Sequence, residues 1–196
     1  APVIYNEEEA QRSEEEITKA VHNMGYMAAT VKRSTKIKKK KIKLYYDVTA
    51  GKPYVVQSIK YDINDPQIAA LLKQDSAKSL LKEKMYFDVN VLDADRQRIT
   101  DKLLRNGYYK FNKDFLVYQA DTTRNTYLVD LTLKLLPYQR KKEDPPQKHR
   151  QYLVNSVNFI ADSEMTPIRK GSFTGFDSLS YKGYNMYYKD KMFLRP

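Results

Sequence analysis

Apolar residues recur along this chain with two periods, and the change from one period to the other marks its helices and strands. The helical period places three residues on one face of a first helix: Ile17, Val21 and Met24. Ser13 followed by Glu16 predicts a capping box at the start of that helix. Gly25 suits the left-handed position just past a helix end, so we expect the helix to stop there.

A period of two residues predicts two hairpins. Residues 27–34 and 42–48 form the first pair of strands, and the run KIKKKKIK at residues 36–43 contains the turn between them. Residues 108–121 and 127–137 form the second pair. Four apolar residues of its last strand alternate with polar ones: Val129, Leu131, Leu133 and Leu135. This alternation predicts one buried and one solvated face for each sheet.

One strand and two helices lie between the hairpins. The strand spans residues 54–63, and a short helix at residues 65–73 has Pro66 at its start, a favoured position for proline. A longer helix follows and stops at Gly107. Its inward-facing residues are Ile99 and Leu103.

The chain repeats itself. ITKAVHNMGY at residues 17–26 and ITDKLLRNGY at residues 99–108 both end on Gly-Tyr, and their glycines are 107 − 25 = 82 residues apart. YVVQSIKY at residues 54–61 is echoed by YLVNSVNF at residues 152–159. One full unit therefore reads strand, helix, helix, strand, strand.

We predict tandem units of this kind. Residues 1–50 are the second half of a unit, residues 54–138 a complete unit, and residues 151–196 the beginning of a further unit with an insertion. Residues 139–150, QRKKEDPPQKHR, form a charged linker with prolines. The predicted fold class is α+β, each complete unit having a three-stranded mixed sheet covered on one face by two helices.

Composition narrows the functional classes. The 196 residues carry a formal net charge of +11, which permits attraction to phosphate-bearing partners, and 17 tyrosines offer stacking surfaces. A basic nucleic-acid-binding module is therefore an alternative. Cysteine is absent, which excludes disulfides and thiolate metal sites. No apolar stretch is long enough to cross a bilayer as a helix, no signal peptide opens the sequence, and its abrupt ends favour a piece of a longer protein.

We do not expect an enzyme. His22 and His149 are the only histidines, and His149 falls in the predicted linker. A Gly-rich phosphate loop, a nucleophile elbow and metal-ligand spacings are all missing from the sequence. Asp93 and Asp95 form a carboxylate pair in DADR, but at a helix start such groups interact favourably with the helix dipole. We therefore predict no catalytic residue, no metal site and no cofactor.

The element order and three short motifs together carry a family resemblance. The motifs are NGYYKF at residues 106–111, GYMAATV at residues 25–31 and AGKPYVVQSIKY at residues 50–61. They resemble polypeptide-transport-associated (POTRA) domains of the outer-membrane assembly proteins of the BamA/TamA surface-antigen family. Residues 163–190 depart from the compact pattern by an insertion.

The resemblance implies a periplasmic module of an outer-membrane protein assembly or translocation machine. Its expected partners are unfolded outer-membrane proteins, accessory assembly subunits and a C-terminal membrane β-barrel of the same chain, with no nucleic acid. Attachment to the outer membrane would be through that barrel. An open sheet edge has unpaired backbone groups, so it can pair with an extended client strand by β-augmentation.

By the same resemblance, the edge offered to clients is the strand just after Gly-Tyr, at residues 109–119 here and residues 27–33 in the first unit. The candidate client-binding residues are Tyr109, Lys110, Phe111, Phe115, Val117 and Tyr118. Core packing is the alternative role for the aromatic residues, and protection of the edge against aggregation is the alternative for Lys110 and Lys113. The predicted structural turn residues are Gly25, Tyr26, Gly107 and Tyr108.

Overall fold

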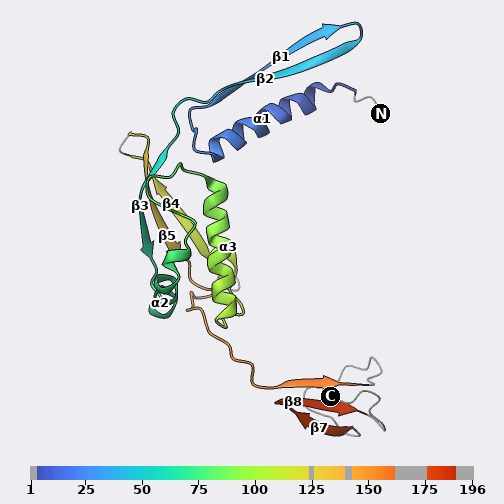
Figure 1. Ribbon diagram of the computed structural model, residues 1–196, viewed down its shortest axis with the longest axis vertical. Coiled ribbons are helices and arrows are strands. Elements are labelled where there is room, and N and C mark those ends of the chain that lie inside the picture. Colours follow the sequence, from blue (N-terminus) through green and yellow to red (C-terminus); the bar gives the residue numbers. More distant parts are fainter. Residues whose placement is uncertain (1–3, 124–125, 140–142, 162–175, 189–196) are drawn as a thin grey trace. The chain divides into compact units, whose positions relative to one another are not determined.

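Residues 4–123, 126–139, 143–161 and 176–188 are described by the computed structural model shown in Figure 1. The chain divides into two units, residues 1–151 and residues 152–196. The helices and strands of the first unit are α1 (Glu7–Asn23), β1 (Thr30–Lys38), β2 (Lys41–Thr49), β3 (Val55–Asp62), α2 (Pro66–Gln74), the 3-10 helix η1 (Ser76–Lys78), α3 (Val89–Arg105), the 3-10 helix η2 (Lys113–Phe115), β4 (Leu116–Asp121) and β5 (Leu128–Leu135). The second unit contains β6 (Val157–Ile160), β7 (Asp177–Tyr181) and β8 (Tyr184–Tyr188).

The helix α1 begins seven residues earlier than the capping box at Ser13 predicts. Asn6 is the N-cap, and its side chain accepts a hydrogen bond from the Glu8 backbone N–H at 2.9 Å. The predicted cap residue Ser13 instead lies inside the helix, where its hydroxyl donates to the Glu9 carbonyl. The capping-box prediction was wrong because Asn6 precedes three glutamates, which stabilise a first turn through the helix dipole.

The strands β1 and β2 form an antiparallel hairpin along α1 (Figure 1). The first strand begins at Thr30 rather than at residue 27, and the turn falls at Lys39 and Lys40, within the predicted lysine run. Arg33 of β1 forms ion pairs with two glutamates of α1, Glu7 at 2.6 Å and Glu14 at 3.4 Å. These contacts hold the hairpin against the helix.

The second sheet has the strand order β3-β5-β4. The central strand β5 is parallel to β3 and antiparallel to β4, with Ile59 opposite Leu131 and Tyr118 opposite Leu133. The sheet is therefore mixed, with β3 and β4 as its two edges. A register shift between Val56 and Ser58 marks a bulge in β3.

The helices α2 and α3 cover one face of this sheet. Their buried residues Ile68, Leu72, Ile99 and Leu103 pack in one core cluster with Leu116 of β4 and Leu133 of β5. A second cluster joins Leu92 of α3 to Val129 and Leu131 of the same β5 face. The alternation predicted for β5 is confirmed, since Val129, Leu131 and Leu133 are buried and the residues between them are not. The predicted α+β class, with a mixed sheet under two helices, is likewise confirmed for this part of the chain.

The ends of α1 and α3 have the same backbone geometry. At α1, Gly25 has a φ of 91°, its N–H donates to the His22 carbonyl, and the Tyr26 N–H donates to the Val21 carbonyl. At α3, Gly107 has a φ of 87° and the Tyr108 N–H donates to the Leu103 carbonyl. Both endings are Schellman motifs, which need a residue that tolerates positive φ. The repeated Gly-Tyr is therefore a repeated helix stop.

Gly25 also lies at the junction with the next strand. Its carbonyl accepts a hydrogen bond from the Tyr54 N–H at 2.9 Å, and the Tyr54 carbonyl accepts from the Phe87 N–H at 2.9 Å. A Cβ atom at Gly25 would lie 2.5 Å from the Phe87 carbonyl oxygen. This close approach requires glycine as firmly as the positive φ does.

In the second unit, the strand order is β6-β8-β7, with β6 parallel and β7 antiparallel to β8. This topology is that of β3, β4 and β5. The sequence predicted that residues 152–159 repeat the opening strand at residues 54–61. The structure begins β6 at Val157, and β7 and β8 follow it. The predicted insertion at residues 163–190 lies partly outside the described residues.

Candidate strand-pairing edge

The strand β4 is an edge of its sheet, with β5 as its one neighbouring strand. Its side chains alternate: Leu116 is fully buried, Val117 is exposed, Tyr118 is half-buried and Gln119 is exposed. The helix-covered face of the strand is thus apolar and the open face is solvated. The sequence predicted two client-binding edge strands, each following a Gly-Tyr pair. The strand β4 is the one that follows Gly107-Tyr108.

The predicted strand at residues 109–119 is shorter in the structure and begins at Leu116. Residues 109–112 form a turn, in which the Phe111 N–H donates to the Tyr108 carbonyl, and residues 113–115 form η2. Asn112 caps η2 by accepting a hydrogen bond from the Asp114 N–H. The strand prediction for residues 109–115 was wrong because this local capping competes with the extended backbone.

The candidate residues consequently lie in different environments. Tyr109 is 75% exposed on the turn and Lys110 is exposed beside it. Phe111 is buried in the core between α2, α3 and the sheet, and Phe115 is half-buried against the same cluster. Core packing, which the sequence left open, therefore describes Phe111 and Phe115. Val117 is the candidate with an exposed apolar side chain on the edge strand itself.

Tyr118 faces the protein and binds a buried carboxylate. Its hydroxyl donates to Asp95 Oδ2 at 2.9 Å, and Asp95 has no exposed surface. The other oxygen of Asp95 accepts from the Leu80 N–H and from Arg98 Nε, both at 2.9 Å. Burial and the adjacent Asp95 charge raise the pKa of the Tyr118 phenol. This network joins β4 to α3 and to the loop before it.

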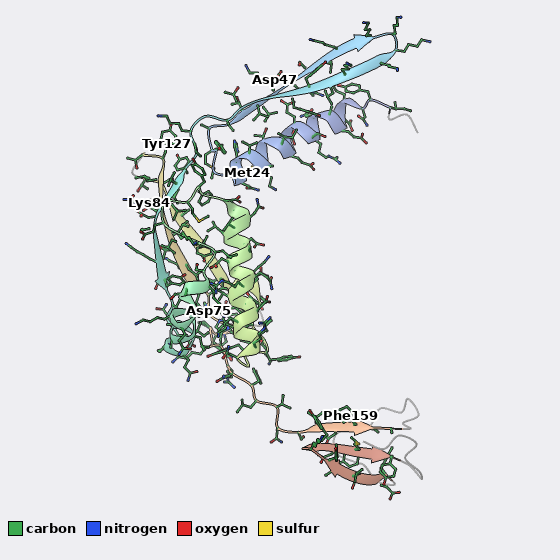
Figure 2. All side chains as sticks on the ribbon, viewed as in Figure 1. Met24, Asp47, Asp75, Lys84, Tyr127 and Phe159 are labelled. Atoms are coloured by element: carbon green, nitrogen blue, oxygen red, sulfur yellow. The ribbon has the colours of Figure 1, made fainter. Side chains whose placement is uncertain are left out.

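Arg98 extends the network to the end of α2. Its guanidinium also binds Asp75, which Figure 2 shows among the side chains at the base of α2. Burial lowers the pKa of Arg98, but the Asp95 hydrogen bond and the two carboxylate charges more than offset this and leave that pKa raised. The sequence interpretation of Asp95 as a helix-dipole residue was wrong, because Asp95 lies two turns into α3 and faces inward.

Asp93 ties η2 to α3. It accepts hydrogen bonds from Lys113 Nζ at 2.8 Å and from Arg96 at 3.1 Å, and Arg96 also donates to the Lys113 carbonyl. The Lys113 hydrogen bond holds the pKa of the Asp93 carboxyl below its usual value. Lys113, considered from sequence as an edge-protecting lysine, is therefore engaged with the helix.

The opposite edge, β3, is partly covered by the chain itself. Val55 pairs with Tyr86, the Val56 N–H donates to the Met85 carbonyl, and the Lys84 N–H donates to the Val56 carbonyl. Lys84, which is labelled in Figure 2, has a positive φ of 66°. Residues 84–86 thus occupy the first half of the β3 edge. A shallow hollow of about 310 Å³ lies beside the end of β3, lined by Tyr61, Ile63, Ala69, Leu72, Lys73 and Ser76.

Sequence reasoning missed the role of residues 143–151. The backbone N–H groups of Tyr138 and Gln147 each donate a hydrogen bond to the carbonyl oxygen of the other residue. The centre of the His149 ring lies 5.0 Å from that of the Phe111 ring and 4.8 Å from that of the Phe115 ring. The Gln151 side chain donates to the Asn106 carbonyl. Much of the predicted linker therefore packs on the first unit. The charged residues and prolines of this segment predict a linker, whereas His149 packs on the two phenylalanines through its aromatic ring.

The described part of the chain contains no group of three or more His, Asp or Glu side chains arranged to hold a metal ion. Its helices also include none with the length and apolar character needed to span a bilayer. His22 is occupied locally, since its Nε2 lies 3.0 Å from the Ala29 carbonyl oxygen.

Comparison with known families identifies the first of the repeated segments. The profile of the POTRA family, described as a surface antigen variable number repeat, matches residues 3–51. We call residues 3–51, which match this profile, the POTRA segment. The resemblance predicted from sequence is thereby confirmed. No curated protein matches the chain.

The solved structures that are similar to the chain include three whose descriptions refer to POTRA domains. BamA from Haemophilus ducreyi lacking POTRA domains 1–3 is 19% identical, with a TM-score of 0.41 over 69% of this chain and 24% of that one. Haemophilus influenzae BamA POTRA3-5 is 13% identical, with a TM-score of 0.44 over 92% and 80%. POTRA1-3 of the periplasmic domain of Omp85 from Anabaena is 16% identical, with a TM-score of 0.31 over 70% and 53%. The chain thus spans about a quarter of the first of these.

The POTRA segment and the following part of the chain share an element order. The segment contains α1, β1 and β2, a helix that stops at Gly25 followed by an antiparallel hairpin. Downstream, α3 stops at Gly107 and is followed by the antiparallel strands β4 and β5. In this alignment β4 corresponds to β1 of the POTRA segment.

Proposed function

We propose that this chain is a periplasmic polypeptide-binding module of an outer-membrane protein assembly machine. The POTRA match at residues 3–51 supports this role. We also propose that the predicted division holds, with residues 1–50, 54–138 and 151–196 as parts of three successive POTRA units. The proposed partners are unfolded outer-membrane proteins, accessory assembly subunits and a membrane β-barrel of the same chain. The module acts by binding rather than by catalysis.

The proposed binding element is the edge strand β4, and its position in the strand order β3-β5-β4 is the observation that carries the proposal. A client strand paired with β4 forms main-chain hydrogen bonds, which do not depend on the client sequence. Strands of membrane barrels alternate apolar and polar side chains. Such a strand would extend the sheet with its apolar side continuing the helix-covered face and its polar side continuing the face of Gln119.

The internal contacts of β4 suit this role. An edge strand that pairs with varied clients needs a fixed backbone, because a mobile edge pays conformational entropy at each binding event. The Tyr118–Asp95 hydrogen bond and the burial of Leu116 anchor the strand from inside. Of the six candidate residues, Val117 is the one we propose as a direct side-chain contact, with Tyr109 and Lys110 flanking the strand. Tyr118 is proposed as a positioning residue.

The test is a titration of the ¹⁵N-labelled chain with a peptide of about ten residues whose apolar and polar side chains alternate. We expect the amide signals of residues 116–120 to shift and those of the central strand β5 to change less. Val117→Lys should weaken peptide binding by placing a charge on the edge. Leu104→Lys on α3 is the matched control, because Leu104 is 41% exposed and Val117 is 40% exposed.

Two outcomes would refute the proposal. Peptide shifts confined to residues 57–62 would move the site to the β3 edge. Equal binding by the Val117→Lys and Leu104→Lys variants would show that the β4 edge does not contact the peptide.

A further inference from the structure

The free end of the β1–β2 hairpin carries a concentrated positive charge. We call residues 36–43 the lysine tip; its cations are Lys36, Lys38, Lys39, Lys40, Lys41 and Lys43. All six are exposed, and no acidic residue lies within the tip. Glu7 and Glu14 of α1 bind Arg33, outside the tip. Among the ion pairs of the described residues, none involves a lysine of the tip.

The opposed lysine pairs and the turn lysines work against the stability of the hairpin. The register places Lys36 opposite Lys43 and Lys38 opposite Lys41, and like charges in directly opposed positions destabilise a strand pair. Lys39 and Lys40 both have positive φ, 46° and 59°, at the two turn positions where Asn-Gly is strongly favoured. The turn thus carries a charge and a backbone conformation that work against folding. A ligand that binds the lysines explains both.

An uncovered apolar pair lies on the other face of the tip. Ile37 and Ile42 are cross-strand partners, 74% and 40% exposed. Arg33, on the same face of β1, already contacts Glu7, the first residue of α1, so the tip extends past the start of that helix. Among the described residues, the helix therefore lies along the base of the hairpin, and Ile37 and Ile42 keep exposed surface beyond it. Figure 1 shows the hairpin running along α1 toward that N-terminal end.

We propose that the lysine tip binds the surface of an anionic lipid membrane. Clustered lysines are attracted to anionic headgroups, and the exposed isoleucines on the other face of the tip enter the headgroup–acyl boundary when the tip inserts end-on. Tyr45, which is 40% exposed with the Lys36 ammonium 5.5 Å from its ring centre, suits the same interface. A nucleic acid would neutralise the lysines but offers nothing to Ile37 and Ile42. The proposal stands on the hairpin alone and does not depend on strand pairing at β4.

The test measures flotation of the 196-residue chain with vesicles at about 0.1 M salt, with phosphatidylglycerol mixed into phosphatidylcholine or left out. We expect binding to the anionic vesicles and not to the neutral ones. The variant Lys39→Asn/Lys40→Gly installs the turn pair that this backbone favours, so it removes two charges without weakening the hairpin. At about a factor of five per lysine, it should partition about 30-fold more weakly.

Matched variants separate the tip from general charge. Lys19→Gln/Lys60→Gln removes the same charge at exposed sites on α1 and β3, and it should bind nearly as well as the native chain. Ile37→Thr/Ile42→Thr keeps β-branched residues and should weaken binding about 10-fold. Equal losses for the Lys19/Lys60 and Lys39/Lys40 variants would overturn the proposal. Binding to a single-stranded oligonucleotide without binding to anionic vesicles would also overturn it.

Discussion

The hydrogen bond between Tyr118 and Asp95 should couple the edge strand β4 to α3, and a double-mutant cycle tests this directly. Asp95 is fully buried and accepts three hydrogen bonds at 2.9 Å, from the Leu80 N–H, Arg98 Nε and the Tyr118 hydroxyl. Asp95→Ala removes the acceptor for all three donors. Breaking one partner out of a buried charge network costs about 3–5 kcal/mol of unfolding free energy.

Tyr118→Phe is the milder change. It removes one donor and leaves Asp95 bound to Leu80 and Arg98, so we expect a loss of about 1.5–3 kcal/mol, the usual range for a hydrogen bond to a charged group. Once Asp95 is alanine, the Tyr118 hydroxyl has lost this acceptor and its removal costs little. The double variant should therefore be more stable than the sum of the single losses predicts, by about 1.5 kcal/mol or more.

Urea unfolding followed by far-UV circular dichroism measures all four proteins, provided that their m-values agree. Tyr108→Phe is the matched control: Tyr108 is buried, but its hydroxyl lies 3.5 Å from Gln67 Oε1, a weak contact. Its loss should be small and additive with Asp95→Ala. A coupling energy near zero for Tyr118 and Asp95 would refute the idea that this bond fixes the edge strand.

Two further predictions concern the repeated helix stop and the attachment of η2. Gly25→Ala should destabilise the first unit more than Gly51→Ala. Both positions have positive φ, which costs a non-glycine residue about 1 kcal/mol, but a Cβ atom at Gly25 would lie 2.5 Å from the Phe87 carbonyl oxygen, whereas one at Gly51 would make an ordinary 3.7 Å contact with Ala28 Cβ. Equal losses in thermal unfolding would contradict this. The hydrogen bond from Lys113 lowers the pKa of the Asp93 carboxyl in the folded protein. Their contact therefore stabilises the fold at pH values above the unfolded-state pKa of about 3.9, and this stabilisation is lost as the pH falls through the folded-state pKa. Lys113→Met should therefore flatten the decline in stability below about pH 4, by less than about 1 kcal/mol because Asp93 is 47% exposed; an unchanged decline would contradict this.

Short-range patterns carried most of the fold. The alternation of Val129, Leu131 and Leu133 was sufficient to predict the central strand and its buried face, because the side-chain period of a strand is fixed by the backbone. The two Gly-Tyr pairs predicted both helix stops, because a Schellman ending is built from residues adjacent in sequence. The order of these elements carried the family resemblance.

The candidate site was predicted less completely. The sequence located the edge strand after Gly107-Tyr108 but assigned residues 109–115 to it, since Phe111 and Phe115 read equally well as strand residues or as core residues. Only the packing of α2 and α3 on the sheet determined that Phe111 is buried. The capping of η2 by Asn112 is a local signal that a closer reading of the turn could have found.

The sequence by itself determined the helices, the strands, their buried faces and the lysine run, because each of these depends on neighbours within a few residues. Tertiary structure alone decided that Asp95 is a buried centre for Tyr118, Arg98 and Leu80, since its partners lie 3 to 23 residues away. It also decided that His149 packs on Phe111 and that Ile37 and Ile42 remain exposed. A carboxylate, an imidazole or an isoleucine has no fixed role in sequence, because its energy depends on which distant groups surround it and how much water they exclude.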